Sequence, residues 1–172
     1  GLNPGNVRHI LLSDSKLTPR HRKLLLGRDL QRYELTWSGT WVNYDPSLKD
    51  TIGPNETRSK KGMTAQARVA FALRDSSIYK PNKVMVRKTA DHIVGSLDSE
   101  GFCFDSLSYG IRPKTGEYDP KFLLGLLNSK YVGYMHAELS QNQNKVFAKV
   151  LAKNLRRLPM PDVDLNSVQD CA

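Results

Sequence analysis

Short apolar runs separated by Asp, Ser and Gly fill the middle of the chain, from residue 83 to residue 113. The runs are residues 83–88, 92–94, 102–104 and 107–111. Apolar runs of this length between turn-forming residues are typical of strands, so we expect an antiparallel meander or a small sheet. Because the first run ends in Arg87 and Lys88, its strand would place two cations at one rim of that sheet.

The same pattern predicts fewer elements in the first half of the chain. We expect a strand over residues 7–12, a second strand over residues 40–44 and a helix over residues 65–74. The leucines of residues 24–26 should be buried. We expect the aromatic side chains of Trp37, Trp41 and Tyr44 to pack in the core and not to stack on bases.

A charged turn follows the leucine run. Asp29 is placed to cap a short helical turn over residues 30–33. Such a turn would set Arg28 and Arg32, which are four residues apart, on one side. Farther along, residues 45–63 are predicted to form a long loop that carries Lys60 and Lys61. A basic loop suits a phosphate backbone, and a solvated loop without a ligand explains it equally well.

Helical patterns dominate the last third of the chain. Asp119 followed by Pro120 is a strong helix start, and the helix should run to about residue 139. Small residues at spacing four in this helix suggest a tight pair with a second helix; they are Gly125, Ser129 and Gly133. The second helix would carry a stripe of cations, Lys145, Lys149, Lys153 and Arg157. These cations repel one another, and either an opposing phosphate backbone or solvent could relieve the repulsion.

Length and composition favour a single domain. The chain has 172 residues, 39% of them hydrophobic and 25% charged, which is ordinary for a globular protein with a real core. Strands in the middle and helices at the end predict an α+β fold. We interpret residues 1–172 as one domain, cut from a longer protein.

The charge balance changes the picture of function. A net charge of +9 and an isoelectric point near 9.6 favour a polyanionic partner, nucleic acid before an anionic membrane. A basic but inert surface is the alternative. No apolar run approaches the roughly 18 residues of a membrane span.

Recognisable catalytic chemistry is missing from the sequence. Cys103, Cys171 and the four histidines stand alone, without the spacing of a disulfide framework or a metal site. The sequence has no glycine-rich phosphate loop, no dinucleotide fingerprint and no nucleophile elbow. A binding module is therefore favoured over an enzyme, and a reducing cytoplasm fits the cysteine content.

Five short motifs follow one another along the chain. They are LGRDLQRY at residues 26–33, KVMVRK at 83–88, LSYGI at 107–111, LLGLLNSK at 123–130 and NLRRLPMP at 154–161. Each motif is short, but the ordered set spans most of the chain and resembles the TaqI-like C-terminal specificity domain. Residues 45–82 match no part of the pattern. The resemblance also implies that the closing basic segment is partly non-helical, in conflict with a continuous second helix.

The resemblance implies a β-rich body with a C-terminal helical hairpin. It also implies a role as the target-recognition domain of a bacterial or archaeal restriction-modification protein, located in the cytoplasm. In such proteins duplex DNA lies between this domain and a separate catalytic domain, in the same or a partner chain, that methylates adenine with S-adenosylmethionine. The chain itself would hold no cofactor and no metal, and would not be an enzyme. A nuclease could be fused elsewhere in the same protein.

This hypothesis assigns DNA-binding roles by residue type. Arginine pairs with guanine, and Asn or Gln pairs with adenine, so the base-reading candidates are Arg28, Arg32, Gln141, Asn142, Gln143 and Asn144. The phosphate-binding candidates are Lys60, Lys61, Arg87, Lys88, Lys145, Lys149, Lys153 and Arg157. An RNA-binding module, a basic scaffold without base specificity and a small nuclease remain the competing interpretations.

Overall fold

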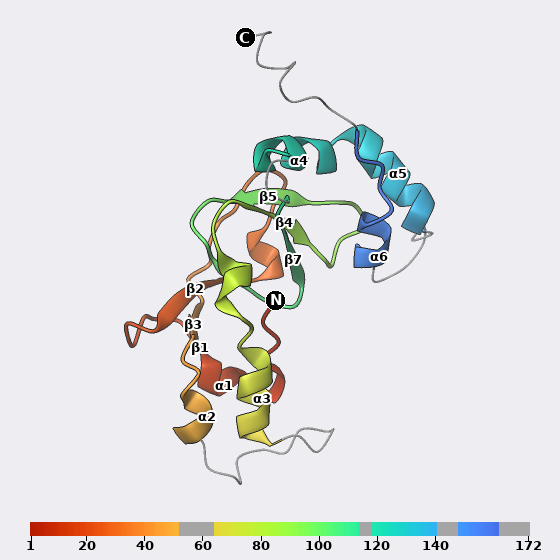
Figure 1. Ribbon diagram of the computed structural model, residues 1–172. Coiled ribbons are helices and arrows are strands. Elements are labelled where there is room, and N and C mark those ends of the chain that lie inside the picture. The colour runs from red at the N-terminus through yellow and green to blue at the C-terminus, as the bar shows by residue number, and fades with distance from the viewer. Residues whose placement is uncertain (52–63, 114–117, 141–147, 162–172) are drawn as a thin grey trace.

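Two sheets and several short helices make up the computed structural model, which describes residues 1–51, 64–113, 118–140 and 148–161 (Figure 1). The α+β fold class is as predicted. Ahead of the central sheet the elements are η1 Gly5–Val7, α1 Arg8–Leu11, β1 Leu12–Ser13, β2 His21–Leu25, η2 Gly27–Asp29, β3 Trp41–Asn43, α2 Leu48–Thr51, α3 Ala65–Ala72 and η3 Ser76–Tyr79. The remaining elements are β4 Lys83–Arg87, β5 Gly95–Asp98, β6 Cys103–Phe104, β7 Ser108–Ile111, α4 Pro120–Leu127, α5 Lys130–Ser140 and α6 Ala152–Leu155.

The predicted central strand, β4, is the middle strand of an antiparallel sheet with the order β5-β4-β7. The meander is only partly right, for two reasons. Residues 92–94 form no strand, and the sheet continues with β5 instead. β6 leaves this sheet and pairs in parallel with β2, where Leu24 faces Cys103. The second sheet therefore has the order β1-β3-β2-β6.

Strand β4 is buried on both faces, which explains its continuous apolar run. Val84 and Val86 face one side and join the core formed with α4, α5 and α6. Met85, between them, belongs to the other core, together with leucines of β2 and Phe104 of β6. Burying each of these side chains stabilises the fold by about 1.5–3 kcal/mol. β4 is thus fixed between the two cores, and this fixes the position of Arg87, its last residue.

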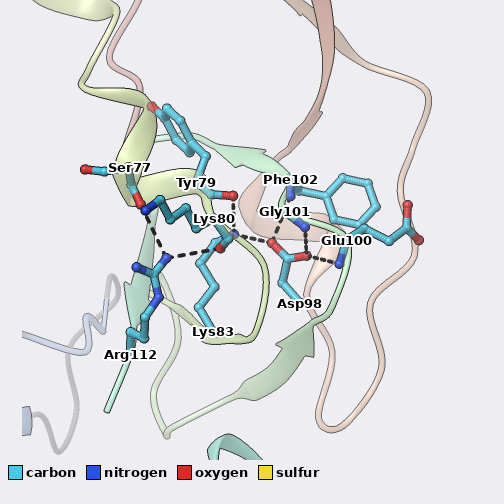
Figure 2. A network of polar contacts seen from close by, with 9 residues as sticks. All are labelled: Ser77, Tyr79, Lys80, Lys83, Asp98, Glu100, Gly101, Phe102 and Arg112. Atoms are coloured by element: carbon cyan, nitrogen blue, oxygen red, sulfur yellow. Dashed lines mark hydrogen bonds and ion pairs between the residues drawn. The ribbon is translucent and has the colours of Figure 1, made fainter. Parts of the chain in front are cut away.

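A buried ion pair joins β4 to β5 at the opposite end of the strand. The ammonium of Lys83 donates to the Asp98 carboxylate and to the carbonyls of Tyr79, at 3.2 Å, and Lys80, at 3.1 Å (Figure 2). The side chains of Lys83 and Asp98 are 1% and 0% exposed. Burial lowers the pKa of Lys83, while Asp98 acts in the opposite direction. This charge therefore lies inside the protein and not at a rim available to ligands.

Asp98 also orders the chain that follows β5. Its carboxylate accepts hydrogen bonds from the backbone amides of Glu100 at 2.9 Å, Gly101 at 2.8 Å and Phe102 at 2.9 Å. Gly101 takes a positive φ of 86°, which favours glycine. The turn at residues 99–101 is therefore held by one side chain (Figure 2).

The N-terminal segment differs from the predicted strand. Residues 5–11 form η1 and α1, and only Leu12 and Ser13 extend into β1. Val7 and Leu11, four residues apart, both pack against Val69 of α3. A strand would have placed the same two side chains on one face. The apolar run therefore did not distinguish a helix from a strand.

The outcome for the rest of the first half is mixed: α2, Leu48–Thr51, lies where residues 45–63 were predicted to form a loop, while other predictions are confirmed. β3 occupies the predicted strand, and α3 begins after Thr64, whose hydroxyl accepts from the Ala67 amide at 3.2 Å. The leucines of residues 24–26 are buried. Trp37 and Tyr44 pack against the same core. The two tryptophans also meet edge to face, with 5.0 Å between ring centroids.

The single helix predicted over residues 120–139 is two helices, α4 and α5, separated at Asn128 and Ser129. α4 is capped at its end by Asn128, whose backbone amide donates to the Leu124 carbonyl at 3.0 Å and whose side chain binds Gly95 of β5. The predicted tight helix pair through small residues is wrong, since a Cβ on Gly125 or Gly133 would meet no atom within 4 Å. α4 instead packs on β4 and β5, and α5 packs against α6.

The continuous second helix is also wrong. In the described part of the closing segment only Ala152–Leu155 is helical. Lys153 lies in this helix, Lys149 precedes it and Arg157 follows it, so these cations form no stripe along one helical face. The partly non-helical segment implied by the family resemblance is what the structure has.

Candidate nucleic-acid interface

Several candidate residues lie outside the described part of the chain. They are Lys60, Lys61, Gln141, Asn142, Gln143, Asn144 and Lys145. The placed candidates are Arg28, Arg32, Arg87, Lys88, Lys149, Lys153 and Arg157. The DNA contacts of both sets stay predictions. For the placed candidates, the structure shows which protein groups surround each side chain.

Two of the placed candidates, Arg28 and Arg87, lie around a common hollow together with Arg8. This hollow has a volume of about 320 Å³, and Leu26 and Leu107 contribute apolar walls. A second hollow of about 490 Å³ shares Arg8, Leu26 and Arg28 with the first. We name the combined surface the arginine groove and define it by Arg8, Arg28 and Arg87.

A short turn, closed by the buried side chain of Asp29, sets the position of Arg28. The buried Asp29 carboxylate accepts from the Leu26 amide at 2.9 Å, and its own amide donates to the Leu26 carbonyl at 2.9 Å. The helical turn covers Gly27–Asp29 and ends at Asp29, so the predicted helical turn over residues 30–33 is wrong. Leu26 and Asp29 point inward, which leaves the side chain of Arg28 70% exposed.

The groove arginines have few partners within the described residues. Neither Arg8 nor Arg87 has a side-chain hydrogen bond or an ion pair there, and Arg28 has only a long contact, 3.9 Å from its Nε to Asp29. A guanidinium has five donors and is always charged. Three such groups around one concave surface can bind an anion or a row of acceptors.

Acidic side chains also line the groove, one in each of its two hollows. Asp14 lines only the larger hollow and Asp105 only the smaller one. The Asp105 carboxylate accepts from the Leu107 amide at 3.0 Å. Burial raises the pKa of Asp105, against the effect of its hydrogen bonds to Leu107 and Ser108 and of the positive charge of Arg8. The shared walls, by contrast, carry Arg8 and Arg28.

The candidates adjacent in sequence have different surroundings. Arg32 does not lie beside Arg28 on a helical turn; its guanidinium donates to the Asn128 carbonyl at 2.9 Å and lies over the Tyr33 ring. The Lys88 ammonium lies 3.5 Å from the Ser106 carbonyl and 5.5 Å from the centroid of the Tyr109 ring. Both cations thus have contacts within the fold that Arg87 and Arg8 lack.

Cations of β2 and of the preceding loop also contact carboxylates or aromatic rings of the protein. Arg20 pairs with Asp45 at 2.5 Å, and Lys23 pairs with Glu100 at 3.2 Å. Arg22 lies over the Tyr44 ring, 4.5 Å from its centroid. A hollow of about 360 Å³ beside Lys23 is therefore a weaker anion site than the arginine groove.

Metal-ligating side chains do not gather in the described part of the chain. They contain no group of three or more His, Cys, Asp or Glu side chains that could hold a metal ion. Cys103 is buried, and burial raises the pKa of its thiol to about 12. Among the same residues, no helix has the length and apolar character to cross a membrane.

Sequence reasoning missed Arg8. It predicted a strand over residues 7–12 and gave the arginine no role. The groove joins Arg8 of α1, Arg28 of η2 and Arg87 of β4, which no local spacing connects. The available signal was the arginine itself at the start of an amphipathic segment, and that signal does not identify its neighbours.

The comparisons with known proteins bear on most of the chain. The family model described as the TaqI-like C-terminal specificity domain matches residues 22–160. No curated protein matches the sequence. The matched region contains Arg28 and Arg87 and excludes Arg8.

Proposed function

The chain belongs to the TaqI-like C-terminal specificity domain family, and we propose that it recognises a short sequence in duplex DNA for a restriction-modification methyltransferase. The family match carries this proposal, because it spans the central sheet, the second sheet apart from β1, and the C-terminal helices. The net charge of +9 and the arginine groove support a polyanionic ligand.

In this proposal the chain selects the site and a separate catalytic domain acts on it. That domain, in the same polypeptide or a partner chain, flips an adenine out of the duplex and methylates it with S-adenosylmethionine. The parent protein is then an adenine-specific methyltransferase or a restriction enzyme of a bacterium or archaeon. The chain supplies affinity through phosphate contacts and selectivity through base contacts.

An RNA-binding module is the main competitor, and the aromatic side chains bear on it. Single-stranded nucleic acid is bound by stacking bases on exposed rings. The exposed aromatic residues of the described chain are Tyr33, Phe71, Tyr131 and Tyr134. Arg32 lies over the Tyr33 ring, and Arg74 and Arg68 lie over Phe71. Tyr131 and Tyr134 belong to α5 and do not line the arginine groove. None of these four exposed rings is therefore placed to stack a base inside the groove.

Competition between duplex and single strands tests the proposal. We expect a labelled random-sequence duplex of about 20 base pairs to resist displacement by the same sequence as single-stranded DNA or RNA. The physical reason is the regular double row of phosphates that a duplex presents to a rigid basic surface. Fluorescence anisotropy with each competitor over a range of concentrations measures the preference. Stronger competition by single-stranded RNA would favour the alternative module.

A further inference from the structure

The arginine groove has a specific place in DNA binding. We infer that it holds the sugar–phosphate backbone of one strand, with phosphates between the guanidinium groups, and that base reading occurs elsewhere on the chain. This inference rests on the proposed function and assigns one surface within it. It includes Arg8, which lies outside the region matched by the family model.

The chemistry of the groove fits phosphodiesters. Arg8 and Arg87 have no side-chain acceptor within the described residues, and Arg28 has one contact at 3.9 Å. Guanidinium groups bind phosphate oxygens through two parallel hydrogen bonds, and they are less strongly hydrated than ammonium groups. Partners elsewhere hold Arg20, Arg32 and Lys23 in place. The three groove arginines differ from those cations in having no close partner among the described residues, and they lie around one concave surface.

The apolar walls fit the sugars between phosphates. Leu26 and Leu107 lie among the arginines, and Leu107 is 49% exposed although it is a large aliphatic residue. An exposed leucine between cations is poorly suited to a free inorganic anion, which would gain nothing from it. The carbon face of a deoxyribose can cover it while the neighbouring phosphates reach the guanidinium groups.

The shape of the groove separates backbone from base contacts. Base edges lie at the floor of the DNA grooves and are reached by protruding helices or ribbons. The backbones are the ridges of the duplex, and a ridge fits a concave surface. The two adjoining hollows, of about 490 and 320 Å³, make a concave surface with arginine on its shared wall.

The local structure makes the groove rigid. Arg28 extends from a turn held by the buried Asp29. Arg87 is the last residue of β4, and its backbone amide donates to the Val94 carbonyl at 3.0 Å. Arg8 begins α1, whose Leu11 is buried against α3. Preorganised cations lose little backbone entropy on binding, so each phosphate contact should contribute measurable affinity.

Single substitutions to glutamine test the assignment. Arg8→Gln, Arg28→Gln and Arg87→Gln are compared with wild type and with Lys121→Gln, which removes one exposed cation from α4 outside the groove. Dissociation constants are measured for a random-sequence duplex and for a duplex selected for tight binding, each at several salt concentrations. Melting temperatures confirm that the variants fold alike.

We expect each groove variant to weaken binding to both duplexes by the same factor, about tenfold. The slope of log affinity against log salt should fall by about 0.9 for each phosphate that the variant no longer neutralises. Lys121→Gln should change neither quantity in this way, and Arg28→Lys should keep most of the salt slope because it keeps the charge.

Two results would overturn the inference while the proposed function stands. Wild-type affinity in all three groove variants would show that the groove is not occupied by DNA. A weakening confined to the selected duplex would show that the groove reads bases. A wild-type chain that binds neither duplex at low salt would contradict the proposed function as well as this inference.

Discussion

Replacing Asp98 with alanine is expected to lower the free energy of unfolding by about 3–5 kcal/mol. The substitution leaves the Lys83 ammonium, 1% exposed, without its carboxylate partner. It also removes the acceptor for three backbone amides, those of Glu100, Gly101 and Phe102. Because native domains are stable by only about 5–15 kcal/mol, this is a large fraction of the total. Urea denaturation of wild type and variant measures it.

Lys23→Ala is the matched control for this effect. Lys23 also pairs with a carboxylate, that of Glu100 at 3.2 Å, but the two side chains are 41% and 61% exposed. Exposed pairs contribute about 0–1 kcal/mol, so the control should be nearly neutral. Similar small decreases for both variants would show that the Lys83–Asp98 pair does not hold β4 and β5 together.

Replacing Asn128 with alanine is expected to lower the free energy of unfolding by about 2–3 kcal/mol. The side-chain amide of this buried residue accepts from the Gly95 amide at 2.9 Å and donates to the Gly95 carbonyl at 2.9 Å. Alanine leaves the buried Gly95 amide without an acceptor. The Gly95 carbonyl keeps one partner, the Tyr33 amide at 2.8 Å. Thermal and urea unfolding of the variant provide the measurement.

Gln31→Ala controls for the removal of an amide side chain. Gln31 is exposed, and its substitution should change the free energy of unfolding by less than about 0.5 kcal/mol. A decrease in Asn128→Ala no greater than in this control would contradict the structural role of Asn128. Asn128→Asp should also be destabilising, because the carboxylate cannot donate to the Gly95 carbonyl.

The motifs that carry the family resemblance thus include residues that build the scaffold. Asp29 closes the turn that exposes Arg28, and Asn128 joins the end of α4 to β5. Arg32 adds a third connection, since it donates to the Asn128 carbonyl across 96 residues of sequence. The short pattern at residues 26–33 therefore combines a structural acid with two exposed arginines, of which Arg32 is bonded to the Asn128 carbonyl.

The sequence predicted the centre of the fold better than its connections. The run at residues 83–88 identified β4 because a strand buried on both faces is continuously apolar. The same pattern could not assign residues 102–104 to the second sheet. Their pairing with β2 joins segments far apart in the sequence and leaves no local signal. Residues 7–12 were misassigned because a short apolar run fits both periods.

The candidate interface was predicted residue by residue and not as a surface. Arg28 and Arg87 were both singled out by charge, but their adjacency depends on the packing of η2 beside the end of β4. The cations with partners could not be separated from those without, since Arg32 and Lys88 contact backbone carbonyls that the sequence does not display. Sequence thus supplied the cation types, and folding decides which are available to a ligand.

Sequence-specific recognition of duplex DNA is the central claim. Its most direct test is binding of the chain to a pool of random duplexes at two salt concentrations, followed by sequencing of the retained DNA. A target-recognition domain predicts a short enriched motif that persists at the higher salt, because base contacts are less salt-sensitive than phosphate contacts. Retention that disappears with salt and leaves no enriched motif would contradict it.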